Sequence, residues 1–204
     1  MSEGKTLPLY VHPVDSKPFG LSYEEWTEKW WKWLLSIPKE RSPSMDFTGA
    51  NANENQTDPN VFFLCQTIEG EESTPHRSIR IPTSKDILVP IMNWVSVLHV
   101  NGETDEELIK CATERMDVIK ELTMSINGVK LDMELRNFRV KSRVFDFILP
   151  EKNVFDLPSG FTRLVSDGYW LLFHPLDELK GISTFSTCSS GLTKIAVEYG
   201  LEKS

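Results

Sequence analysis

The chain has 204 residues, of which 40% are hydrophobic and 25% are charged, a composition typical of a globular protein rather than a disordered one. Its formal net charge of −8 disfavours nucleic acid or an anionic membrane surface as a partner, because both attract basic surfaces. No apolar run approaches the roughly 20 residues that span a bilayer. The start of the chain has no signal-peptide core, and its cysteines show no paired spacing. We therefore expect one cytoplasmic domain over residues 1–204, with no metal and no cofactor.

The N-terminal region is predicted to be an extended arm over residues 1–20, followed by a helix over residues 22–37. Ser22 and Glu25 have the spacing of a capping box, in which each side chain satisfies the other residue's backbone N–H. Pro38 ends the helix, because the residue before a proline is restricted to extended conformations.

This helix is expected to carry two apolar faces. At 100° per residue, Trp26, Trp30 and Trp33 form one stripe, and Trp31 with Leu35 forms a second stripe on nearly the opposite side. The first stripe is expected to pack on a sheet or to offer a binding platform. The second stripe must be covered by the same chain, by a ligand, or by a second copy in a homodimer that uses Trp31 and Leu35.

Residues 39–60 are predicted to form a long polar loop, because prolines, Gly49 and many Asn and Asp residues interrupt any regular pattern. Loops of this length in a compact domain are usually functional. The asparagines of the loop do not keep the register of a calcium loop, since Phe62 stands where the closing glutamate should be.

Residues 61–204 are predicted to form a β-rich body. Apolar or alternating runs indicate strands over residues 61–65, 76–82, 86–92, 138–149, 168–173, 181–188 and 193–199. Pro90 within its run indicates an edge strand or a bulge, and Asn127-Gly128 is the strongest hairpin signal. A stripe of apolar residues after Thr104 predicts one inserted helix over about residues 105–122.

These elements predict a mostly β fold, namely a β-sandwich or partly open barrel of about seven to eight strands, with an N-terminal Trp-rich helix and one inserted helix. Arg139, Lys141 and Arg143 are expected to share one face of the strand over residues 138–149. That face is either a solvated outer surface or a site for an anion.

Several motifs together carry a resemblance to a protein family. They are Trp26-x-x-x-Trp30-Trp31-x-Trp33, Asp46-Phe-Thr-Gly49, Arg77-Ser-Ile-Arg80-Ile-Pro82 followed by Lys85, Pro90 and Asn93, and Asp167-Gly168-Tyr169-Trp170. In this combination the chain resembles a group of uncharacterised bacterial and archaeal proteins. The resemblance implies a β-sandwich and no established activity. The chain departs from the group after the last motif, where Lys180-Gly181-Ile182-Ser183 lacks the histidine of a Gly-x-His-x-Ile hairpin.

The motifs are expected to converge on one cavity, walled by the Trp helix and by the strand that bears Arg80. The candidate ligand-binding residues are Trp30, Trp31, Asp46, Arg80, Lys85 and Asn93. Asp46 and Asp167 are the candidates for an acid/base pair.

The sequence contains no recognisable catalytic set, because its histidines are scattered and no phosphate-binding loop occurs. We therefore expect a non-catalytic protein that binds a small polar ligand or a protein partner. One alternative is a hydrolase or isomerase of a small anionic substrate, with Asp46 or Asp167 as base and Arg80 or Lys85 as the electrostatic stabiliser. The other alternative is a homo-oligomeric structural protein.

Overall fold

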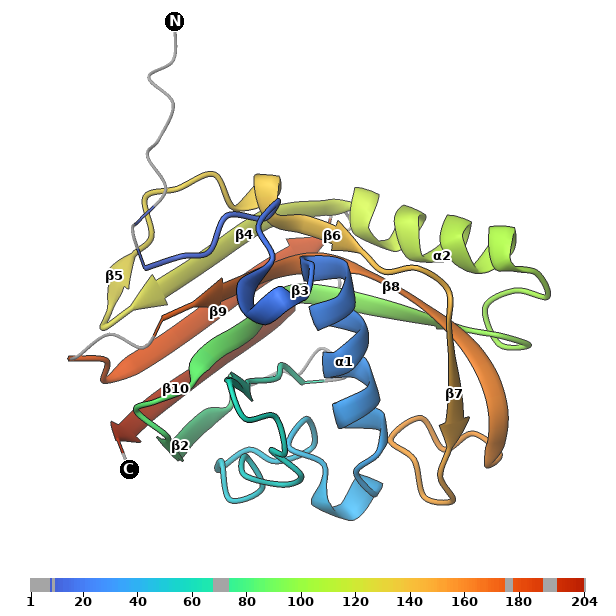
Figure 1. Cartoon of the computed structure of the whole chain (residues 1–204), viewed down its shortest axis with the longest axis horizontal. Coiled ribbons are helices and arrows are strands. Elements are labelled where there is room, and N and C mark those ends of the chain that lie inside the picture. The colour runs from blue at the N-terminus through green and yellow to red at the C-terminus, as the bar shows by residue number, and fades with distance from the viewer. Residues whose placement is uncertain (1–7, 9, 68–73, 175–177, 189–193, 204) are drawn as a thin grey trace, which may run out of the picture.

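The computed structural model describes residues 8, 10–67, 74–174, 178–188 and 194–203 (Figure 1). In this part of the chain ten strands form two mixed sheets, together with two α-helices and three short 3-10 helices at Pro18–Gly20, Lys39–Arg41 and Leu135–Phe138. The mostly β character is confirmed, and the described strands do not close into a barrel. Neither α-helix in the described residues has the length and apolar character needed to cross a membrane.

The first sheet is built around two long antiparallel strands. Its order is β1 (Val61–Phe63), β3 (Asp86–Val97), β8 (Gly160–Phe173) and β6 (Arg139–Lys141), with β7 (Phe145–Leu149) also paired to β8. The prediction of one continuous strand over residues 138–149 is wrong, because β6 and β7 pair with different parts of β8. Between them the chain bends at Ser142, whose backbone N–H donates to the carbonyl oxygen of Ser166 at 2.8 Å.

The second sheet contains the remaining strands. Its order is β2 (His76–Ile81), β10 (Lys194–Lys203), β9 (Gly181–Cys188), β4 (Ile119–Ile126) and β5 (Val129–Lys130). The hairpin predicted at Asn127-Gly128 is confirmed, since these residues join β4 to β5 with φ values of 51° and 78°. Thr193, the first residue of the last predicted strand, lies outside the described residues.

The two α-helices are α1 (Tyr23–Leu35) and α2 (Asp105–Asp117). The capping box of α1 is confirmed, with the Ser22 N–H donating to Glu25 at 2.8 Å and the Glu25 N–H donating to Ser22 Oγ at 3.3 Å. The prediction that α2 continues to residue 122 is wrong. Ile119 begins β4 instead, because pairing with β9 takes this segment into the second sheet.

The helices lie on opposite faces of the first sheet, because neighbouring side chains of β8 alternate between the two faces. On one face, the indole N–H of Trp31 in α1 donates to Ser166 Oγ at 2.9 Å. On the other face, Val165 packs in one apolar cluster with Leu108 and Ala112 of α2. The first sheet is thus a layer between the two helices.

Both apolar faces of α1 are buried within the chain. Trp31 is 5% exposed and Leu35 is 0% exposed, so these two side chains lie in the interior and the expected homodimer patch is not on the surface. The four indole N–H groups of α1 all have acceptors in the protein, namely Pro18 O, Leu64 O, Ser166 Oγ and Glu54 O. The tryptophans therefore anchor the helix to the arm, to the polar loop, to the segment after β1 and to β8 of the first sheet.

Candidate functional site

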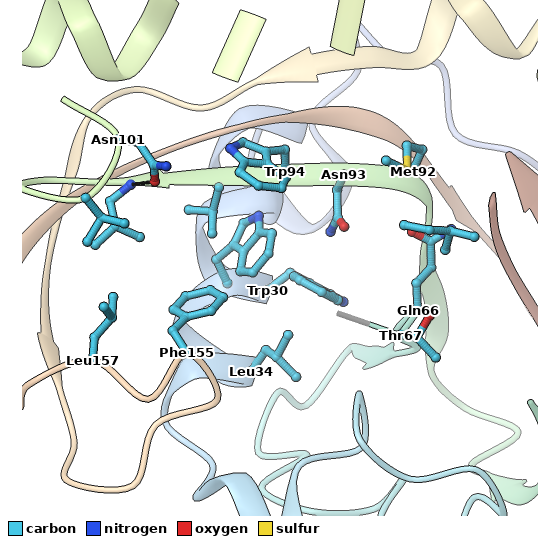
Figure 2. A pocket seen from close by; sticks show the side chains of 15 residues that line it. Trp30, Leu34, Gln66, Thr67, Met92, Asn93, Trp94, Asn101, Phe155 and Leu157 are labelled. Atoms are coloured by element: carbon cyan, nitrogen blue, oxygen red, sulfur yellow. Dashed lines mark hydrogen bonds between the residues drawn. The ribbon is translucent and has the colours of Figure 1, made fainter. Parts of the chain in front are cut away.

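A pocket of about 480 Å³ lies between α1 and β3 (Figure 2). The helix contributes Trp30, Trp31 and Leu34, and β3 contributes five residues, Met92, Asn93, Trp94, Val95 and Val97. The segment after β1, the loops that follow β3 and β7, and Ile195 of β10 complete the lining. The sequence prediction of a cavity beside the Trp helix thus agrees with the structure, although the strand that forms the opposite wall is β3 and not the strand of Arg80.

The helix wall of the pocket is apolar because its tryptophans use their polar atoms within the protein. The Trp30 ring meets Trp31 edge to face at 4.9 Å and Trp170 at 5.1 Å between ring centroids. The indole N–H of Trp30 donates to the Leu64 carbonyl at 2.8 Å, and that of Trp31 is bound to Ser166. What these side chains offer to the pocket is therefore ring surface.

Two carboxamides, of the buried Gln66 and the partly buried Asn93, give the pocket its polar character. Gln66 is 4% exposed, and its Nε2 donates to the Ile91 carbonyl oxygen, which leaves Oε1 buried without a partner in the described residues. Asn93 Nδ2 is also buried and has no partner within the described part of the chain. A buried polar atom without a hydrogen bond costs about 1–3 kcal/mol. Trp94, which also lines the pocket, has a buried Nε1 without a partner in the described residues, so the lining residues contain one acceptor and two donors that the described protein leaves unused.

The position of Asn93 follows from an irregularity in β3. The pairing of β3 with β8 shifts register between Pro90 and Met92, so Pro90 marks a bulge, which was one of the two predicted readings. Beyond the bulge, Asn93 lies opposite Gly168, where an added Cβ would come within 2.7 Å of both Asn93 Cβ and Met92 O. Glycine at 168 therefore allows the backbone of β8 to approach Asn93 closely.

The side chains of Asn93 and its neighbour leave β3 on opposite sides. Figure 2 shows Asn93 directed toward Trp30 and Trp94 directed away from it. The guanidinium of Arg115 in α2 lies 4.7 Å from the centre of the Trp94 ring, which places this ring on the α2 side. Met92 and Trp94 also line the pocket, but in this part of the strand it is the amide of Asn93 that is directed toward Trp30.

The two predicted cationic residues lie away from the pocket. Arg80 is exposed on β2 and forms an ion pair with Glu202 of β10 at 3.1 Å. Lys85 Nζ donates to the Asp58 carbonyl oxygen at 2.5 Å, which ties the polar loop to the start of β3. None of the residues described as lining the pocket carries a charged side chain.

Asp46 also lies away from the pocket and holds its own loop together. Its carboxylate accepts hydrogen bonds from the backbone N–H groups of Thr48 and Asn51, each at 2.8 Å. Burial acts to raise the pKa of Asp46, but these hydrogen bonds and the charge of Arg77 hold it below its usual range. Asp46 is thus an ionised loop cap in the structure.

Asp167 lies on the α2 face of the first sheet and does not meet Asp46. It is 0% exposed, and its two carboxylate oxygens accept from Arg139 at 3.1 and 2.8 Å. Burial raises the pKa of Asp167, while the facing guanidinium acts to lower it. Arg139 also pairs with Asp117 at 2.6 Å. Two carboxylates of the protein thus neutralise the charge of Arg139. Arg143, another residue of the predicted basic stripe, is solvated, and its side chain is 88% exposed.

The structure therefore brings together Trp30, Trp31 and Asn93 from the predicted set, and it adds residues that the sequence analysis missed. Val95 and Val97 share a face with Asn93 through the period of two in β3, a signal that was available in the sequence. Gln66 follows directly after the apolar run of residues 61–65, where a polar residue at a strand end is a weaker signal. Phe155 comes from an irregular loop, and no sequence pattern placed it.

Comparison with known proteins gives no relative. No protein-family model matches the chain, and no curated protein or solved structure matches it. The resemblance drawn from the motifs therefore stays a prediction, and the site is interpreted from its own chemistry.

Proposed function

We propose that this chain is a non-catalytic binding protein of the β-sandwich type, whose pocket between α1 and β3 takes a small, neutral molecule with an apolar body and one amide-like head. The observation that carries this proposal is the pair of buried, unpaired atoms Gln66 Oε1 and Asn93 Nδ2 in a pocket without charged lining residues among those described.

The head group of the ligand follows from the unused atoms. A group that donates to Gln66 Oε1 and accepts from Asn93 Nδ2 would satisfy both, and a primary amide does so with adjacent atoms. A carboxylate is disfavoured, because it would be desolvated next to an acceptor and would meet no cation in the lining. This refines the expectation of a small polar ligand and disfavours the anionic substrate of the enzyme alternative.

The body of the ligand follows from the walls. Trp30, Trp31 and Phe155 present ring surfaces, and Val95 with Val97 presents branched aliphatic groups on the facing strand. Flat aromatic groups stack or pack edge to face against such rings with about 0.5–1.5 kcal/mol per pair beyond area burial. A fused aromatic ring with a short amide arm therefore matches both ends of the pocket.

The proposal is tested by calorimetric titration with three matched molecules, naphthalene-1-acetamide, its N,N-dimethyl amide and naphthalene-1-acetate. We expect the primary amide to bind tightest. The dimethyl amide should bind about 2- to 10-fold more weakly, because it lacks the donor for Gln66 and one hydrogen bond contributes about 0.5–1.5 kcal/mol. The acetate should bind at least about tenfold more weakly than the primary amide, because its charge is uncompensated.

Two variants connect the binding to the pocket. Asn93→Leu removes the donor at similar size and should weaken the primary amide about tenfold, and Val95→Phe should block binding by filling the pocket. Val129→Phe is the matched control, since Val129 is 71% exposed on β5 and belongs to no part of the pocket lining. Equal affinity for all three molecules, or binding that survives both pocket variants, would contradict the proposal.

A further inference from the structure

Two histidines and an aspartate from three distant parts of the chain meet at one end of the first sheet. They are His12 of the N-terminal arm, Asp86 at the start of β3 and His174 directly after β8. One ligand-type atom from each residue lies within 4.8 Å of the corresponding atoms of the other two. The sequence separations of these residues gave no sign of this cluster, because only the strand pairing brings them together.

The backbone on both sides of the cluster is fixed by hydrogen bonds. The N–H of His12 donates to Leu172 O at 2.9 Å, and the N–H of His174 donates to Tyr10 O at 2.8 Å, so the arm runs antiparallel to the end of β8. The hydroxyl of Tyr23 donates to His12 O at 2.8 Å and holds the arm to α1. The three side chains are therefore presented from a preorganised frame.

The carboxylate of Asp86 is the centre of the cluster. Its Oδ2 lies 2.6 Å from His12 Nε2, and its Oδ1 lies 3.1 Å from His174 Nδ1. The Asp86 side chain is 7% exposed, and no lysine or arginine of the described chain forms an ion pair with it. A buried carboxylate needs a positive partner or a metal ion, and each imidazole here presents one nitrogen to it.

We propose that His12, Asp86 and His174 bind a divalent transition-metal ion of the zinc class. Two imidazole nitrogens and one carboxylate are a common donor set for such ions. Bonds of about 2.0–2.1 Å in a tetrahedral site put ligand atoms about 3.3 Å apart. The distances from the two imidazole nitrogens to the Asp86 carboxylate are 2.6 and 3.1 Å, so each has to increase by less than about 1 Å to admit the ion. The ion would lie between the imidazoles and the carboxylate, and it binds the imidazole nitrogens in their deprotonated form.

The site would be open on one side and would fasten the arm. The His174 side chain is 55% exposed, against 16% for His12, so a water molecule can complete the coordination from the His174 side. Because one ligand is in the arm and two are at the ends of sheet strands, the ion links the arm to the first sheet. This role is independent of the pocket proposed for the amide ligand.

The test is a titration of chelator-treated full-length protein with zinc chloride, followed by calorimetry and thermal unfolding. We expect one zinc ion per chain and a melting temperature that rises with zinc concentration. His174→Gln should weaken zinc binding by at least about tenfold, the lower bound known for loss of a supporting group around a metal. It should leave the zinc-free melting temperature near that of the wild type, because the replaced side chain is mostly exposed.

The matched controls are His76→Gln and His99→Gln, whose exposed imidazoles pair with Glu198 and Glu103 outside the cluster. Both controls should bind zinc like the wild type. Substitution with cobalt separates this site from the cysteine thiols, since a thiolate charge-transfer band in the near ultraviolet would place the ion on a cysteine. That band, absence of zinc binding by the wild type, or unchanged zinc affinity of His174→Gln would overturn the proposal.

Discussion

On the α2 face of the first sheet the fully buried Asp167 has both carboxylate oxygens bound by Arg139. On the α1 face Asn93 and Gln66 each leave a buried atom without a partner among the residues that the structure describes. The two faces belong to the same pair of strands, β3 and β8. Asn93 pairs with Gly168, which is the residue directly after Asp167 in β8. A full charge is thus satisfied internally, and two neutral amides are not. Trp94 Nε1 and Ser96 Oγ on the α2 face are also buried without a partner in the described residues, so what sets the α1 face apart is that its unpaired amide atoms belong to residues that line a pocket without charged side chains.

The largest effect is expected from removing Arg139, the cation that pairs with Asp167 on the α2 face. Arg139→Met leaves Asp167 buried and unpaired, and we expect the free energy of unfolding to fall by about 3–5 kcal/mol. The measurement is urea unfolding at pH 7. The control is Arg80→Met, which breaks an exposed pair with Glu202 and should cost less than about 1 kcal/mol.

The pH dependence of this variant has a defined sign. Without Arg139, burial alone keeps the pKa of Asp167 above its unfolded value, so the folded state retains a proton that the unfolded state has lost. The stability of Arg139→Met should therefore fall relative to wild type as pH rises through and above about 4. A stability difference that stays constant between pH 4 and 7 would contradict this account of the α2 face.

Gly168→Ala alters the contact between β3 and β8, the two strands that form both faces. The new methyl group would lie within 2.7 Å of Asn93 Cβ and Met92 O, so β3 and β8 must separate at the polar end of the pocket. We expect a loss of about 1–3 kcal/mol in unfolding free energy together with weaker binding of naphthalene-1-acetamide. Gly200→Ala is the matched control, because its added Cβ meets nothing closer than 3.8 Å. If Gly168→Ala binds naphthalene-1-acetamide with unchanged affinity, the assignment of Asn93 to the binding site is contradicted.

The smallest effect is expected from changing Asp58, which lies beside α1. Its carboxylate accepts from Lys29 of the helix, and it also accepts from the backbone N–H groups of Asn60 and Val61, each at 2.8 Å. Burial acts to raise the pKa of Asp58, but these hydrogen bonds and Lys29 lower it overall. Asp58→Asn should cost about 1–2 kcal/mol at pH 7.

Because the folded-state pKa of Asp58 is depressed, its stabilisation is present above the unfolded value of about 3.9 and is lost as pH falls through the lower folded value. The difference between Asp58→Asn and wild type should therefore shrink below about pH 4. It is measured by thermal unfolding at pH 3, 5 and 7, and a difference that grows in acid would refute the assignment.

Local signals in the sequence predicted the elements that local chemistry controls. The capping box at Ser22, the Asn127-Gly128 hairpin and the bulge at Pro90 depend on a few adjacent residues, and all three are present. The end of α2 was missed because Ile119 fits a helical stripe as well as a strand, and pairing with β9 decides between them. The break between β6 and β7 was missed for the same reason, since it accompanies a one-residue shift in their pairing with β8.

The candidate site was predictable in part. Trp30, Trp31 and Asn93 were placed in it, but Arg80 was placed in it on the strength of a motif. The alternation of β2 buries Arg77, Ile79 and Ile81, so Arg80 has to point outward. Counting the period of two along this strand would have excluded it. Phe155 and the cluster around Asp86 depend on tertiary contacts that no single-sequence pattern carries.

The most direct test of the central claim is a crystal structure of the protein soaked with naphthalene-1-acetamide. The account predicts the ring between Trp30 and β3, with the amide nitrogen within hydrogen-bond distance of Gln66 Oε1 and the amide oxygen within hydrogen-bond distance of Asn93 Nδ2. A ligand bound with its amide turned to solvent, or a pocket that stays without it at saturating concentration, would contradict the account.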